Sequence, residues 1–401
     1  MVAIGPYHRL LPELQAMEVV KKKAQLFFCD GASLEAYEKE VAGVAGAARA
    51  CYDAHSLEGI SDTAFASMMF HDACFLLAAI LAITGENQFM TSVLCLGYAN
   101  ASVVITDMFL LENQIPWVVL QALMTLKKMD LGTFIAKMGM DVQSRIDRKE
   151  RPLELNGYKP PHLLGLFHFY QSGRSHSDCK IWCDEGLTVT PFPASQLCSD
   201  DPRSITKFGI ALPPLTIVME TLPLGTSAVE LAEIGIEVTA SKTSELQDIG
   251  VRKGPLFRKI FLPLLRLNEH TACWLVNMAA FEEVTAFSDG DYIVSSYLSL
   301  FAMFMDREED VHELRAKRLI HGEFTDKQTL DFFKGHHAGS LHAGYQFYRI
   351  LRRLERYKQK WWLWIAVHKF VYKNFKTIVA VLSIVAALAG IFKALISLQK
   401  R

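Results

Sequence analysis

The sequence predicts a mainly α protein: a multi-helix globular domain with a minor β element and one C-terminal transmembrane helix. Two observations carry this prediction. Apolar residues recur at helical spacing through much of the chain, and an uncharged apolar run stands near its end, at residues 377–392. We therefore divide the chain into a helical domain (1–360), a basic and aromatic juxtamembrane segment (361–376) and a membrane-spanning helix (377–398).

The terminal apolar run is long enough to cross a bilayer once its continuation is included. A helix over residues 377–392 rises about 24 Å, and continuing it to Leu398 gives about 33 Å, whereas the hydrocarbon core is about 30 Å thick. Lys393 interrupts the run near one end, where its ammonium group can reach the lipid headgroups. A buried core helix is the alternative, but the length of the run and the basic stretch before it favour a membrane span.

The basic residues that flank this run predict its orientation. The twenty residues before Ile378 hold five lysines, and only Lys393, Lys400 and Arg401 follow the uncharged run. The positive-inside rule then places the domain in the cytosol, with the lipid bilayer as a partner. The first residues contain no apolar run of signal-peptide length. We expect a single-pass protein anchored by its C-terminus.

The other helices are predicted from apolar spacing and from helix breakers. They cover residues 10–29, 34–52, 65–83, 99–111, 117–124, 274–287, 295–305, 306–316 and 326–333. The helix at 65–83 is apolar enough to suggest a second span, but Asp72 at its middle would be costly in lipid, so we predict a buried core helix.

Two regions depart from the helical pattern. Residues 150–215 are rich in Pro, Ser, Gly, His and Cys, and are predicted to be irregular. Residues 235–240 and 257–262 carry β-branched and aromatic residues, and predict a small hairpin-like sheet.

Composition narrows the classes of function. The 42 basic and 43 acidic residues give a net charge of -1, so the chain lacks the overall electrostatic footprint of a nucleic-acid-binding protein. Eight cysteines in a chain of 401 residues are too few for a disulfide scaffold, and we interpret them as reduced thiols. No catalytic motif, phosphate-binding loop or dinucleotide fingerprint occurs, and no cofactor is predicted.

Two clusters of side chains are candidates for a catalytic site and a metal site. Asp72, Asp107 and Glu112 would be the carboxylates of an unrecognised enzymatic site, if they met in a pocket. Cys179 and Cys183 have zinc-compatible spacing with His176, and His168 or Cys198 would complete the site, although the paired halves of a strong zinc motif are missing. Scattered loop residues are the alternative to zinc.

Several segments together resemble one plant family, the domain of unknown function 247. They are Ile4-Gly-Pro-Tyr-His8 followed by Leu14-Gln-Ala-Met-Glu18, Met68–Leu77 around His71-Asp72-Ala73-Cys74, Asp107-Met-Phe-Leu-Leu-Glu-Asn-Gln-Ile-Pro116, and the shorter matches His162-Leu-Leu164, Ala280-Phe-Glu282 and Phe304-Met-Asp306. Ala73 stands where the family usually has glycine. Members of the family usually carry further residues before the first of these segments.

The resemblance implies a single-pass plant membrane protein of unknown activity, and some grass members are implicated in self-incompatibility recognition. It therefore favours a non-enzymatic module that binds a protein partner over the alternative of a membrane-associated enzyme. Glu112, Asn113 and Gln114 follow a predicted helix, and Pro116 suits the first turn of the next. We predict that Glu112, Asn113 and Gln114 bond main-chain groups left unpaired where one helix stops and the next begins. Asp72, Asp107 and Pro116 are predicted to have a structural role as residues of the family motifs.

Overall fold

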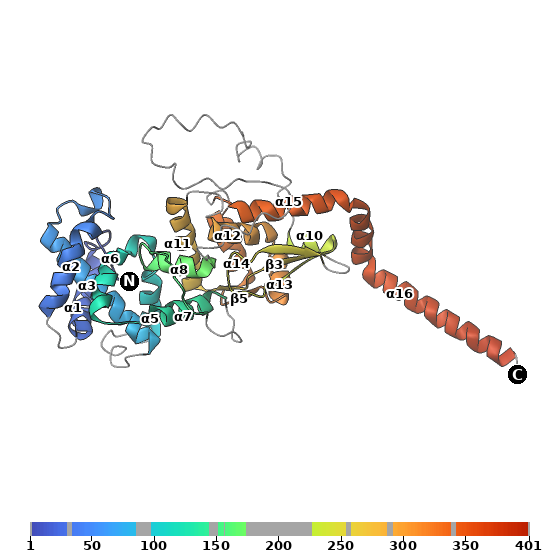
Figure 1. Cartoon of the computed structure of the whole chain (residues 1–401). Helices are drawn as coiled ribbons and strands as arrows, with labels where there is room; N and C mark the ends of the chain where they lie inside the picture. Colours follow the sequence, from blue (N-terminus) through green and yellow to red (C-terminus); the bar gives the residue numbers. More distant parts are fainter. Residues whose placement is uncertain are drawn as a thin grey trace, which may run out of the picture.

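The computed structural model describes residues 2–29, 34–85, 98–143, 151–155, 157–173, 227–253, 258–286, 292–337 and 342–399. Helices dominate these residues, and short strands form a minor element, as the sequence predicts. Figure 1 shows the N-terminal helices at one end of an elongated domain and a long helix that projects from the other end.

The regular elements of the N-terminal half are all helical within its described residues. Its helices are α1 (Ala16–Cys29), α2 (Leu34–Arg49), α3 (Asp62–Thr84), α5 (Tyr98–Asp107), α6 (Trp117–Leu126), α7 (Leu131–Gln143) and α8 (Leu163–Ser172), with 3-10 turns η1 (Pro12–Leu14), η2 (His55–Leu57) and η3 (Leu111–Asn113). Helix α3 is central and packs against α1, α2, α6 and α7. The Ser61 side chain caps its first turn by accepting from the Ala64 N–H, and Gly85, at φ +82°, ends it.

Helix α3 is the buried core helix that its central aspartate predicted. Its length and composition would allow a membrane span, but 67% of its most apolar window is buried inside the domain. The side chains of Phe65, Met69 and Phe75 along it are fully enclosed. Burying such side chains from water stabilises the fold by about 1.5–3 kcal/mol each.

The C-terminal half combines helices with two small sheets. Its elements are α10 (Ala228–Glu233), β1 (Ile236–Ala240), β2 (Gly250–Lys253), β3 (Arg258–Leu262), β4 (Leu265–Leu267), α11 (Glu269–Thr285), α12 (Ile293–Phe304), α13 (Glu308–Ala316), β5 (Ile320–Gly322), α14 (Asp326–His337), α15 (Tyr345–Lys360) and α16 (Trp362–Gln399). Their apolar side chains belong to the same core cluster as those of the N-terminal half.

The sheet differs from the predicted hairpin. Strands β1 and β3 are parallel, with Val238 opposite Ile260, and β2 pairs antiparallel with β3 on its other side. The prediction found β1 and β3 but not their direction, because residue types predict strands and only the connection between them fixes their pairing. A second, parallel pair joins β4 to β5.

Two further predictions need correction. The helix predicted at 10–29 begins only at Ala16, after the 3-10 turn around Pro12. Helix α8 lies inside the segment 150–215 that was predicted to be irregular; its surroundings are rich in breakers, but Leu163–Ser172 are all buried. Most of the rest of that segment lies outside the described residues.

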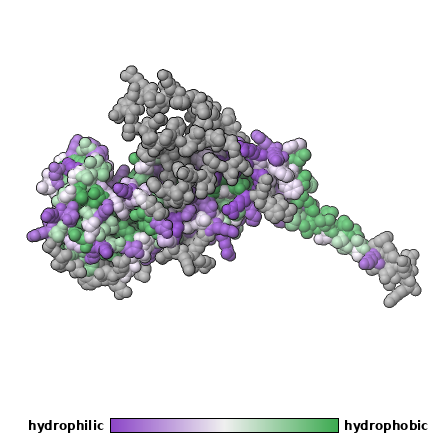
Figure 2. All heavy atoms as spheres, in the orientation of Figure 1, coloured by the Kyte–Doolittle hydropathy of each residue, from purple (hydrophilic) through white to green (hydrophobic). Residues whose placement is uncertain are grey.

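Residues 362–376 of the predicted juxtamembrane segment and the apolar run form one helix. Helix α15 ends at Lys360, and after Trp361 helix α16 runs through 38 residues. None of its most apolar window is buried inside the domain. Figure 2 shows this helix as an apolar rod that extends beyond the domain. By length and composition α16 is a candidate membrane span.

Candidate functional site

Three of the predicted site residues, Asp72, Asp107 and Asn113, meet around the first residues of the chain. Val2, Ala3 and Ile4 are at most 3% exposed, although they lie in no helix or strand. Buried main chain without secondary structure needs other hydrogen-bond partners. Residues from α3, from the end of α5 and from the segment after α5 supply them. We call residues 2–5 with these partners the N-terminal clasp.

Two buried carboxyl groups hold main-chain N–H groups of this segment. The Val2 N–H donates to Asp107 Oδ2 over 2.6 Å, at the last residue of α5. The Gly5 N–H donates to Asp72 Oδ2 over 2.8 Å, in the middle of α3. Asp72 also pairs with Lys21 of α1, whose Nζ lies 2.7 Å from Asp72 Oδ1; both side chains are 2% exposed. Asp72 thus joins α1, α3 and the N-terminal segment.

Asn113 completes the clasp between these carboxyl groups. Its Oδ1 accepts from the Ile4 N–H over 2.7 Å, and its Nδ2 donates to Val2 O and to Asp107 O over 2.9 and 3.0 Å. An amide is suited to this place because it both donates and accepts. Neither aspartate nor leucine, of similar size, does both at neutral pH.

Gln114 links the clasp to the next helices. Its Nε2 donates to Met108 O and Leu110 O over 2.9 and 2.7 Å, where α5 has ended. Its Oε1 accepts from the Leu164 N–H over 2.9 Å, in the first turn of α8. The Tyr52 hydroxyl donates to Gln114 O over 2.8 Å. Gln114 therefore bonds main-chain groups at both helix ends.

Glu112 and Pro116 lie at the edges of this junction. The Glu112 side chain is 68% exposed, and its Oε2 lies 2.9 Å from His8 Nε2. Pro116 is the N-cap residue of α6, so it stands one position before the first turn in which it was predicted. The Trp117 N–H that follows donates to Pro161 O over 2.7 Å.

The N-terminus of α8 depends on a neutral histidine. Burial lowers the pKa of His162 to about 4, so that the ring is uncharged at neutral pH. His162 Nδ1 accepts from the Gly165 N–H over 3.1 Å and caps the helix.

Glu282 forms a second buried junction, between α11 and α12. This side chain, 1% exposed, accepts from the N–H groups of Ile293, Val294 and Ser295 over 2.8–2.9 Å and from Ser295 Oγ over 2.7 Å. Its Oε1 also lies 2.7 Å from His168 Nε2. The carboxylate therefore occupies the N-terminus of α12, where unpaired N–H groups and the helix dipole favour a negative charge.

The metal prediction lies largely outside the described residues. His176, Cys179, Cys183 and Cys198 belong to residues 174–226, whereas His168 is engaged by Glu282. Within the described ranges, no group of three or more His, Cys, Asp or Glu side chains is placed to hold a metal ion. The four cysteines in those ranges, Cys29, Cys51, Cys74 and Cys273, are free thiols.

One contact with catalytic residue types was not singled out from the sequence. His270 Nε2 lies 2.6 Å from Ser102 Oγ, and its Nδ1 lies 2.6 Å from Thr106 Oγ1. A hydrolase would place a carboxylate at the second ring nitrogen to stabilise the imidazolium. Here a hydroxyl one turn along α5 takes that place. The contact therefore links α5 to α11, and it could be found only from the structure.

Burial sets the acidity of Asp107. Desolvation raises the pKa of this carboxyl, against the opposing effect of the Val2 N–H. Because the protonated form is favoured in the folded state, the free energy of unfolding of the wild type should fall, relative to Asp107→Asn, as pH rises above the usual aspartate range. Chemical denaturation of both chains between pH 4 and 8 checks this trend.

Asp53 provides the control of opposite sign. The Ser56 N–H and the Tyr7 hydroxyl hold the pKa of this exposed carboxyl below its usual range. The stability that Asp53 contributes is present above the usual aspartate pKa and is lost as pH falls below it. Asp53→Asn should therefore show the reverse trend when denaturation is extended down to about pH 3. If the free energy of unfolding changed with pH in the same way for the two variants, the account of Asp107 would be contradicted.

Comparison with known proteins identifies the family. The model of the family described as plant protein of unknown function, domain of unknown function 247, matches residues 1–392. The chain belongs to this family. It is also similar to a UPF0481 protein of Arabidopsis thaliana, with 25% identity over 344 residues that cover 83% of this chain and 67% of the relative. No solved structure matches the chain.

Proposed function

We propose that this chain is a membrane-tethered module that binds a protein partner, with α16 as its single span and the helical domain in the cytosol. The observation that carries the tether is the exposure of α16: its candidate membrane span, the 30 residues Trp362–Ile391, has none of its most apolar window buried inside the domain. A helix that is apolar all round is stable only when protein or lipid surrounds it.

Exposed apolar side chains at the other end of the domain support the proposal that it binds a partner. Leu10, Val19 and Leu26 are 78%, 59% and 67% exposed, on α1 and just before it. Figure 1 places α1 at the end of the domain opposite α16, so that a tethered domain would display this surface away from the bilayer. A role in recognition, such as self-incompatibility, would use a surface of this kind.

The alternative of an enzyme gains no support from the carboxylates. Asp72 and Asp107 face main-chain N–H groups of the chain itself, and Glu112 lies apart from them at the surface. A general acid or base needs to reach a substrate. Residues 2–5 of the clasp occupy the place where a substrate would have to bind.

Lysine substitutions within the span test the tether. The double variant Leu382→Lys/Leu388→Lys should shift the full chain from the membrane fraction to the supernatant, because each lysine at the centre of a span costs about 2.5–3.5 kcal/mol. Flotation of the chain with lipid vesicles on a density gradient measures this.

The matched control changes leucines that are as exposed but lie on the domain. Leu10→Lys/Leu26→Lys should leave flotation unchanged. If both double variants floated like the wild type, or the wild type itself stayed at the bottom of the gradient, α16 would not be the tether.

A further inference from the structure

Helix α16 is longer than a bilayer requires. Its 38 residues rise about 57 Å, whereas a hydrocarbon core of about 30 Å needs about 20 of them. Lys369, Lys373 and Lys376 lie in its first part, and residues 377–392 are uncharged. We call residues 362–376 the stem; on the proposed tethering, the stem lies outside the hydrocarbon.

One side of the stem is fastened to α10. Lys369 Nζ and Lys373 Nζ lie 3.3 and 3.8 Å from Glu233 Oε2. His368 Nδ1 lies 2.8 Å from Glu233 O, at the end of α10. Ile365, on the same side, packs against the core. These contacts turn the polar and basic side of the stem toward the domain.

The opposite side of the stem is apolar and uncovered. Leu363, Val367 and Phe370 follow one another at spacings of four and three residues, so they share a face. They are 62%, 57% and 65% exposed. Asn374, which follows on this face, donates from Nδ2 to Phe370 O over 2.8 Å and thereby satisfies a group within the helix itself. A helix on the surface of a soluble domain has the reverse arrangement, with its apolar face inward.

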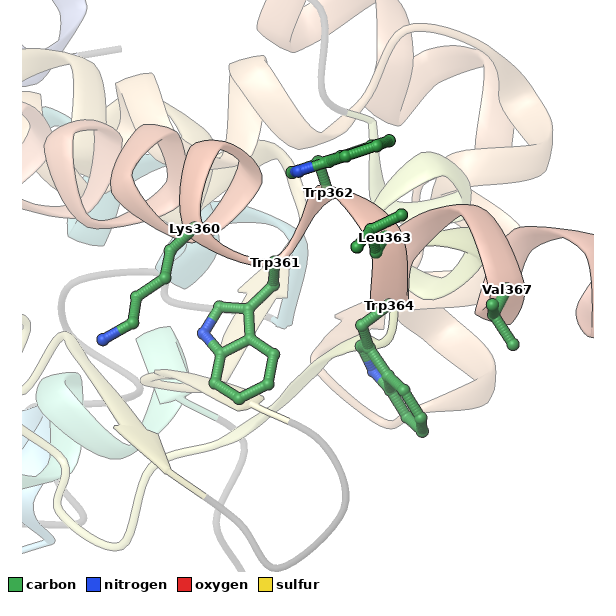
Figure 3. A pocket seen from close by; sticks show the side chains of 6 residues that line it. All are labelled: Lys360, Trp361, Trp362, Leu363, Trp364 and Val367. Atoms are coloured by element: carbon green, nitrogen blue, oxygen red, sulfur yellow. The ribbon is translucent and has the colours of Figure 1, made fainter.

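The same side carries a hollow at the turn from α15 into α16. This hollow has a volume of about 420 Å³ and is lined by Lys360, Trp361, Trp362, Leu363, Trp364 and Val367. Figure 3 shows these six side chains around the turn. Three tryptophans and a lysine are residue types that gather at the boundary between headgroups and acyl chains, where an apolar ring and a polar group are both accommodated.

We propose that the outer face of the stem lies in the bilayer interface, with Phe370 nearest the acyl chains and Val367 and Leu363 successively farther out among the headgroups. The occupant is a lipid surface because the stem continues without a break into the apolar residues 377–392. The apolar face of the stem is therefore next to the point where the helix enters the bilayer. The Glu233 contacts then hold the domain against the membrane in one orientation. This inference rests on the proposed tether.

Fluorescence quenching by brominated lipids tests the two faces of the stem. In the full chain with Trp361, Trp362 and Trp364 changed to phenylalanine, a single tryptophan is introduced by Phe370→Trp on the outer face or by Tyr372→Trp on the face toward the domain. In vesicles of neutral and anionic phospholipid brominated near the headgroup, the Phe370→Trp emission should fall roughly twofold and the Tyr372→Trp emission much less. The chain without a reporter supplies the background of Trp117, Trp182 and Trp274.

Each other outcome overturns the inference. Equal and weak quenching of both reporters in floated protein would place the stem in water, with the tether intact. Equal and strong quenching would place lipid all around it. A blue-shifted Phe370→Trp emission without quenching would indicate a protein cover, such as a second copy of the chain. Protein that does not float would remove the tether and the inference together.

Discussion

Replacing Glu282 by alanine is expected to lower the free energy of unfolding by about 3–5 kcal/mol, because it strands a set of buried donors. The N–H groups of Ile293, Val294 and Ser295 and the His168 ring would lose their acceptor at once, inside the domain. Helix α12 has no side-chain cap of its own at Tyr292 to replace it. Chemical denaturation of the detergent-solubilised chain measures the loss.

The neighbouring glutamate is the control for this variant. Glu283 bonds the His342 N–H from a side chain that is 33% exposed, so Glu283→Ala should cost less than about 1 kcal/mol. If the two alanine variants lost similar stability, Glu282 would not have the structural role described here.

Replacing Asn113 by alanine should cost about 2–4 kcal/mol, because it leaves the Ile4 N–H and the Val2 carbonyl buried without their partner. Both groups bond to the Asn113 amide and are shielded from water. The loss should be concentrated at the chain's start, so hydrogen exchange of residues 2–5 should accelerate more than exchange within α3. Mass spectrometry of exchanged peptides measures both regions.

Glu112→Gln, one residue earlier in the same motif, is the matched control. Its side chain is exposed and faces His8, so that we expect a change below about 0.5 kcal/mol and no faster exchange at residues 2–5. An Asn113→Ala chain that exchanged like this control would show that the clasp does not depend on Asn113.

The local pattern of apolar residues was sufficient to predict most of the helices. Asp72 inside an apolar run predicted a buried α3, because a carboxyl group is costly in lipid and needs a partner in protein. The partner, Lys21, is 51 residues away, and no periodicity relates the two positions. The parallel pairing of β1 with β3 was missed for the same reason.

At the candidate site, too, the sequence predicted the kind of bond but not the partner distant in the chain. Proximity to a helix end predicted that Asn113 and Gln114 bond main-chain groups, and the structure shows such bonds. Which groups they bond depends on the fold: Asn113 Oδ1 accepts from Ile4, 109 residues earlier, and Gln114 Oε1 accepts from Leu164, 50 residues later. Glu282 was noticed only through a family resemblance, since a glutamate within a helix is usually an exposed residue.

Protease protection on sealed microsomes tests the central claim, a cytosolic domain tethered through α16, most directly. The full chain, tagged before Val2, should sediment with the microsomes, and added protease should remove the tag without detergent while residues 377–398 remain protected. Recovery of the chain in the supernatant, or a tag that is digested only after detergent opens the vesicles, would contradict the account.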